Sequence, residues 1–117
     1  MDPVMQRLFW KQIRGGIVDD SIYCPPELCV LFAAQAIQHE HGDFTPENAA
    51  NVVAADELPV RVMNQHGLTA EAWGERIVNA WQGQRGISKE VAVMDYLNIA
   101  QDLEQYVKVL LFTLFRT

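Results

Sequence analysis

The chain is poor in cysteine, in basic residues and in long apolar runs, and each shortage excludes a class of protein. Two cysteines among 117 residues are too few for the disulfide framework of a small secreted domain, so we expect free thiols. Nine Lys and Arg against fifteen Asp and Glu give a net charge of −6, which argues against binding nucleic acid or anionic membranes. No apolar run reaches the roughly 18 to 20 residues of a membrane-spanning helix. The N-terminus is too charged for a signal peptide, so a cytoplasmic location is expected.

Strand signals are also scarce, whereas helix signals recur along the chain. Half of the residues are apolar, and the length suits one compact domain. Capping residues or prolines, followed by apolar residues three and four apart, predict four main helices. They run from Asp2 and Pro3 until Gly15 and Gly16 weaken the pattern, from Pro25 and Pro26 to Gly42, from Thr69 to Gly83, and from Ser88 as the last and longest helix.

The region between Gly42 and Thr69 has weaker periodicity. One or two short extra helices are expected there, one of them beginning near Pro59 and ended by Gly67. The predicted fold is therefore an all-α bundle of four main helices. Its aromatic residues, including Trp73 and Trp81 on one helical stripe, are expected in the core.

The stretch "IYCPPELC", residues 22–29, contains both cysteines and raises the question of chemistry. Zinc sites usually pair cysteines two to four residues apart and add a second pair of ligands, but here the nearest extra candidates, His39 and His41, lie on different sides of a helix end. Cys24 precedes a helix that could stabilise a thiolate, yet no base can be assigned beside it. We therefore expect structural cysteines, with no metal, cofactor or catalytic residues, and a protein that is not an enzyme.

The same stretch carries a family resemblance, because "IYCPPE" resembles the central lobe of the FERM domain in the ezrin, radixin, moesin and merlin family. Other segments resemble that lobe in the same order: "LFW" at 8–10, "GDF" at 42–44, "RVMNQH" at 61–66, Trp73, "ERI" at 75–77, Trp81, "RG" at 85–86 and "YLNIAQDLEQY" at 96–106. The resemblance implies that residues 1–106 form a helical lobe with the arrangement of acyl-CoA-binding protein. Residues 107–117 are then a divergent apolar tail.

The resemblance also implies a function, namely a non-enzymatic interaction module that links membrane proteins to the cytoskeleton at the cell cortex. Its expected partners are cytoskeletal or membrane-protein tails, and its location is peripheral to the plasma membrane. The chain has room for neither the other two FERM lobes nor the actin-binding tail. Direct lipid binding is not expected, because Glu40 and Asn98 stand where relatives tend to have lysine. Phe44 replaces a usual tyrosine, so phosphorylation at this position is impossible.

A small acyl-CoA or lipid carrier is the alternative function, because that fold serves such carriers as well. A carrier needs a basic groove for the nucleotide phosphate. The available cations would be Arg61, Arg76, Arg85 and Lys89, and the sequence does not show that they converge.

The apolar C-terminal tail is the candidate partner-binding segment. Neither Gly nor Pro interrupts the chain after Gly86, and the three-four stripe continues past Tyr106, which favours a helical continuation. A strand is the rival interpretation, but its edge would be unpaired without a neighbouring sheet. A small bundle has little room to bury these side chains, so they are candidates for self-association or partner binding: Val107, Leu110, Leu111, Leu114 and Phe115.

Deleting the residues after Tyr106 is expected to leave a folded monomer, whereas the full chain is expected to self-associate through its apolar tail. Sedimentation of both forms at increasing concentration measures the difference. A full-length chain that is already monomeric at high concentration would contradict the prediction.

Overall fold

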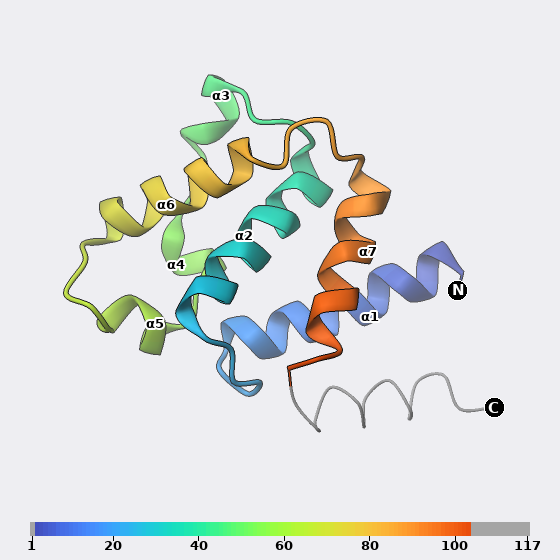
Figure 1. Cartoon of the computed structure of the whole chain (residues 1–117), viewed down its shortest axis with the longest axis horizontal. Helices are drawn as coiled ribbons and strands as arrows, with labels where there is room; N and C mark the ends of the chain where they lie inside the picture. Colours follow the sequence, from blue (N-terminus) through green and yellow to red (C-terminus); the bar gives the residue numbers. More distant parts are fainter. Residues whose placement is uncertain (1, 104–117) are drawn as a thin grey trace.

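The computed structural model describes residues 2–103, which form helices and connecting turns without a strand. Four long helices make a bundle, and three short ones join the second long helix to the third (Figure 1). The helices are α1 Pro3–Val18, α2 Pro26–His41, α3 Pro46–Ala49, α4 Ala54–Glu57, α5 Val60–Asn64, α6 Ala70–Gln82 and α7 Lys89–Ala100. The all-α class and the four main helices are confirmed, but the expectation of one or two short helices is wrong, because there are three.

Local capping explains where the long helices begin. The Asp2 side chain accepts a hydrogen bond from the Val4 N–H at 2.8 Å, ahead of α1. Thr69 and Ser88 cap α6 and α7 in the same way, each through a bond of 3.1 Å to the N–H three residues on. These caps satisfy N–H groups that have no partner inside the helix, so the predicted starts are confirmed.

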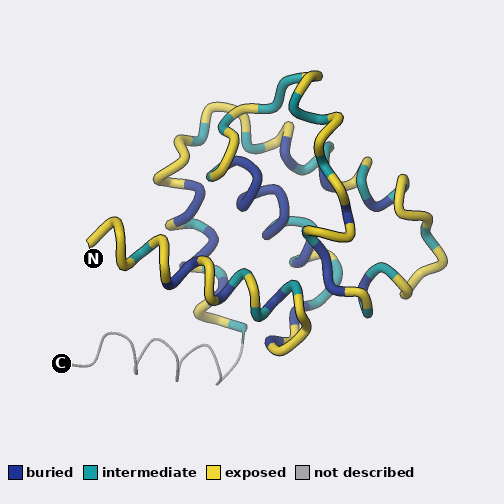
Figure 2. Tube along the Cα trace, turned by 180° about the vertical axis from the view of Figure 1, so that it is seen from behind, coloured by how far each residue is buried: buried dark blue, intermediate teal, exposed yellow. Residues whose placement is uncertain are grey.

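The central helix of the bundle is α2, which packs against both α6 and α7. Figure 2 shows it buried along most of its length, and an uninterrupted run of buried residues covers 32–38. A helix that is enclosed on most sides carries apolar or small residues around its circumference, and the alanines among these buried residues fit that position. Trp73 and Trp81 face this core with 3% and 0% of their surface exposed, which confirms the stripe predicted for α6.

The first helix does not end at its glycines, contrary to the sequence pattern. It continues through Gly15 and Gly16 to Val18, and the chain then turns at Asp20, whose φ is 68°. A Cβ on Gly16 would lie 2.7 Å from the Ile22 Cδ1 atom. Gly16 therefore allows the loop after α1 to fold back closely onto the helix, which a local propensity rule cannot reveal.

Three short helices form between α2 and α6 because the chain changes direction repeatedly there. The Thr45 hydroxyl accepts a bond from the Asn48 N–H at 3.1 Å and starts α3. A separate turn forms α4, and α5 begins directly after Pro59, as predicted. The chain then reverses at His66 and Gly67, with φ values of 68° and 63°, in agreement with the predicted stop.

The helix that begins after Ser88 is not the longest one within residues 2–103, so the expectation of a longest helix there is wrong. It has 12 residues and ends at Ala100, whereas α1 and α2 have 16 each. Beyond Ala100 the backbone hydrogen bonds change from the α-helical to the 3₁₀ pattern. The N–H groups of Asp102 and Leu103 bond to carbonyls three residues back rather than four. The apolar spacing continues through this change and so does not signal it. The predicted tail helix, with Val107, Leu110, Leu111, Leu114 and Phe115, lies outside the described residues.

One buried glutamine joins α2, α6 and the loop before α7. Gln38, with 1% of its surface exposed, donates from Nε2 to the Ile87 carbonyl at 2.7 Å and to Asp43 Oδ1 at 2.8 Å. Its Oε1 accepts a bond from Trp81 Nε1 at 3.1 Å. Each polar atom of this buried amide is thus paired, which offsets the cost of burying it.

The turn after α2 completes this network. Gly42 ends the helix with a φ of 79°, and its carbonyl accepts a second bond from Trp81 Nε1 at 2.9 Å. Asp43 Oδ1 also accepts from the Gly86 N–H at 3.0 Å, and the Gln38 and Gly86 bonds lower the pKa of this carboxyl. Phe44 meets Trp81 edge-on, with 5.4 Å between ring centroids. The network therefore connects the "GDF" and "RG" segments, which lie more than 40 residues apart in the sequence.

Replacing Gln38 by Met is expected to lower the free energy of unfolding by about 1 to 3 kcal/mol, because the Ile87 carbonyl loses its hydrogen bond, whereas Trp81 and Asp43 each keep one other bond. Gln35→Met is the matched control on the same helix, since the buried Gln35 Oε1 has no hydrogen-bond partner within residues 2–103. The control should cost less than about 1 kcal/mol. Urea unfolding measures both variants, and equal losses would contradict the assigned role of Gln38.

Candidate interaction surface

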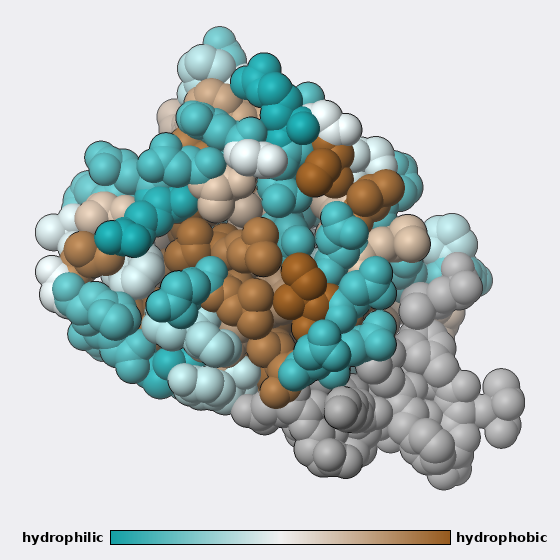
Figure 3. Space-filling view, viewed as in Figure 1, coloured by the Kyte–Doolittle hydropathy of each residue, from teal (hydrophilic) through white to brown (hydrophobic). Residues whose placement is uncertain are grey.

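One groove on the surface of the bundle lies between α2 and α6 and is here called the α2–α6 groove. Its volume is ≈ 580 Å³. Figure 3 shows apolar side chains gathered over α2 on this face, between α6 and α7. The groove is lined by Pro26, Glu27, Val30, His66, Leu68, Trp73, Arg76 and Asn79.

The geometry of the groove combines an apolar floor with charged flanks. Trp73 is held in place by a hydrogen bond from Nε1 to the Met63 carbonyl at 3.2 Å. His66 lies 6.4 Å from the Trp73 ring centroid, and the Arg76 guanidinium lies 5.9 Å from it. Glu27 flanks the groove from the first turn of α2, where the helix N-terminus favours a carboxylate. Such a groove can receive an apolar side chain flanked by polar groups, and it is a candidate contact surface.

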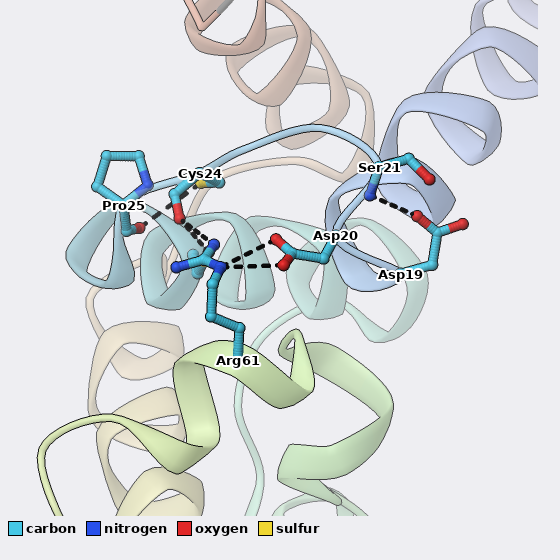
Figure 4. A network of polar contacts seen from close by, with 7 residues as sticks. Asp19, Asp20, Ser21, Cys24, Pro25 and Arg61 are labelled. Atoms are coloured by element: carbon cyan, nitrogen blue, oxygen red, sulfur yellow. Dashed lines mark hydrogen bonds and ion pairs between the residues drawn. The ribbon is translucent and has the colours of Figure 1, made fainter.

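A cluster of polar contacts centres on Arg61 of α5 (Figure 4). Its Nε donates to both carboxylate oxygens of Asp20, at 3.1 and 3.0 Å, and its Nη2 donates to the Cys24 carbonyl at 3.1 Å. The guanidinium also lies 4.7 Å from the Tyr23 ring centroid. These contacts tie α5 to the loop between α1 and α2, so Arg61 has a structural role and joins "RVMNQH" to "IYCPPE".

The two cysteines are free and buried, with 0% and 1% of their surface exposed. The Cys29 thiol donates to the Cys24 carbonyl at 3.4 Å, and the Cys24 thiol donates to the Pro25 carbonyl at 3.6 Å. The hydrogen bond with Cys29 and burial raise the pKa of the Cys24 thiol. A raised pKa disfavours the thiolate that nucleophilic catalysis requires. Because both thiols are buried and hydrogen-bonded, both residues pack at the start of α2, as the sequence predicts.

The four cations considered for a phosphate-binding groove do not assemble around the α2–α6 groove. Arg76 lines it, but Arg61 is engaged by Asp20. Arg85 lies in the loop after α6, where its positive charge helps to lower the pKa of Asp43. Lys89 is the first residue of α7 and lies near Gly42. The geometry therefore offers little support for a nucleotide-phosphate site.

The chain is similar to known proteins over most of its length. Residues 1–109 match the model of the FERM central domain. The chain belongs to the FERM central-domain family.

No helix within residues 2–103 is long and apolar enough to cross a bilayer, and no three His, Cys, Asp or Glu side chains there group as metal ligands would.

Individual relatives agree with this membership. Over 102 residues this chain is 45% identical to "Moesin/ezrin/radixin homolog 1" of Culex quinquefasciatus and, equally, to that of Aedes aegypti. Each alignment covers 86% of this chain but 18% of the relative, so the chain spans less than a fifth of these proteins. The crystal structure of the FERM and C-terminal domain complex of Drosophila Merlin matches with a TM-score of 0.84 and 32% identity, covering 91% of this chain and 36% of that one. The resemblance seen in the sequence is thereby confirmed, as is the bundle arrangement.

Sequence reasoning located the motifs but missed the α2–α6 groove. Leu68 and Val30 look like ordinary core positions, and His66 looks like a loop residue, because nothing local indicates that they share a surface with α6. The left-handed turn at His66 and Gly67 is what brings them together, and the glycine was the available signal. The candidate tail residues named from the sequence lie outside the described part of the chain, so the structure places none of them in the groove.

Cys24 and Cys29 are expected to bind no zinc and to resist thiol-reactive reagents until the chain unfolds, because both sulfur atoms are buried and hydrogen-bonded. Thiol titration of native and urea-unfolded protein, with metal analysis of the purified chain, tests this. Rapid labelling in the native state or stoichiometric zinc would contradict it.

Proposed function

We propose that this FERM central domain is a non-enzymatic protein-interaction module of the membrane–cytoskeleton linker type. The observation that carries the proposal is the family match over residues 1–109. It is supported by the contacts between the segments that resemble the family, since the Gln38 and Arg61 networks join "GDF" to "RG" and "RVMNQH" to "IYCPPE". The partners proposed are cytoskeletal or membrane-protein tails. The working location is the cytoplasmic side of the cell cortex, peripheral to the plasma membrane.

Two surfaces contribute to this proposed function. The α2–α6 groove provides apolar contacts with polar flanks on one face of the bundle. The apolar tail, with Val107, Leu110, Leu111, Leu114 and Phe115, adds a segment for self-association or partner binding. Residues 1–106 are thus proposed as the folded lobe and residues 107–117 as an apolar extension that mediates association.

Capture of cytoplasmic tail peptides from membrane proteins by the purified full chain tests the proposed function. Enrichment over scrambled peptides of the same composition is expected. Leu68→Ser should weaken capture, because Leu68 lines the α2–α6 groove from a loop and is only half-buried. Val60→Ser is the matched control, since Val60 is 71% exposed and does not line that groove.

Two results would overturn the proposal. One is the absence of enrichment over scrambled peptides for every tail tested. The other is tight, submicromolar binding of acyl-CoA in calorimetry, which would favour the alternative of a small acyl-CoA or lipid carrier. Thermal melting of each variant shows whether a loss of capture reflects unfolding.

A further inference from the structure

A second groove lies on the other side of α6, and we propose that it binds a basic amphipathic helix of a partner protein. This inference rests on the proposed interaction function and specifies one of its partners. The groove, here called the α4–α6 groove, has a volume of ≈ 580 Å³, within the range of about 300 to 1,000 Å³ of ligand pockets. It is lined by Ala49, Val52, Val53, Ala54, Ala70, Glu71, Gly74, Glu75, Val78 and Asn79.

The groove is apolar and open because its lining side chains are small. Gly74 lines it from α6, and a Cβ placed there would meet no atom of residues 2–103 within 4 Å. Val53 also lines it, with 51% of its surface exposed, although it directly precedes α4, which packs against α6. A mid-helix glycine costs helix stability relative to alanine, and no close contact with another of the described residues requires one at position 74. As far as residues 2–103 are concerned, the space above Gly74 is available to a side chain from another molecule.

The charge of the groove determines which partner it fits. Its two ionisable lining residues, Glu71 and Glu75, are both acidic, exposed and four residues apart on α6. Like charges at this spacing destabilise a helix slightly, and neither carboxylate has an ion-pair partner within residues 2–103. Lysine or arginine side chains flanking an apolar segment would complement them.

The architecture of the groove also selects the shape of the partner. The described residues contain no strand, so they offer no sheet edge to which an extended peptide could add. A groove between helices instead accommodates the apolar face of another helix, with anchors spaced three and four residues apart. The proposed occupant is therefore an amphipathic helix with apolar residues on one face and basic residues beside them.

A synthetic helical peptide of about 14 residues, with leucines along one face and flanking lysines, is the probe. Its affinity for the full chain is measured by fluorescence anisotropy, and a version with glutamates in place of the lysines is the charge control. The basic peptide is expected to bind at least about tenfold more tightly than the acidic one. Binding should weaken as the salt concentration rises.

Filling the groove gives the sharpest test. Gly74→Leu is expected to weaken binding at least about tenfold, because the new side chain occupies the space of a peptide anchor. Gly15→Leu is the matched control, since Gly15 also lies within a helix and a Cβ there also meets nothing within 4 Å. Both variants should melt no earlier than the natural chain, because leucine favours helix over glycine.

Charge removal is an independent test that leaves the groove open. The double variant Glu71→Gln, Glu75→Gln should weaken binding of the basic peptide and reduce its salt dependence. Glu90→Gln with Asp102→Asn changes the net charge equally, but both residues are exposed and line neither groove, so this variant should bind as the natural chain does.

The inference is overturned if the basic peptide does not bind, if Gly74→Leu binds it normally, or if both charge variants weaken binding equally. These failures are separate from failure of the proposed function. If membrane-protein tails are captured while the basic peptide is ignored, the interaction function stands and the α4–α6 groove does not. If the peptide binds in a Gly74-dependent manner but no tail is captured, the groove stands and the proposed partners do not.

Discussion

The hydrogen bonds of Gln38 are the interaction on which the arrangement of the bundle most depends. The side chain lies near the end of the central helix, and through Trp81, Asp43 and the Ile87 carbonyl it links that helix to α6 and to the start of α7. A buried amide is costly unless its polar atoms are paired, so the pairing is satisfied only in one register of these three elements. Apolar packing alone tolerates small shifts between helices, whereas this network does not.

The position of α6 is the link between this core and the surfaces proposed for binding. Trp73, Ile77 and Trp81 face the interior and are almost fully buried. The remaining faces of the same helix border two grooves, with Arg76 beside α2 on one side and Gly74 toward α4 on the other. The buried tryptophans fix the position of α6, and the segments before α4 and α6 supply the other side chains that line the two grooves. This is how a small helical domain can offer more than one contact surface.

Features that depend on neighbouring residues in the chain were predictable. The starts of α1, α2, α6 and α7 follow from local caps and prolines, and the tryptophan stripe follows from its spacing. The C-terminal ends of the helices were harder to predict, because α1 continues through two glycines and α7 ends at Ala100 without a glycine or proline. Gln38 looked like one more polar residue near a helix end, since its partners are supplied from distant segments. The two grooves were missed for the same reason.

The sequence by itself determined the helical class, the family and the non-disulfide state of the cysteines, because these follow from composition, spacing and motif order. Only the tertiary structure decided that Arg61 is held by Asp20 and the Cys24 carbonyl instead of joining a phosphate site. It also decided that no other part of residues 2–103 lies close above Gly74, whereas Gly16 packs closely against Ile22. The physical reason is that both glycines have the same local helical preference, and what distinguishes them is the atoms brought near from other parts of the chain.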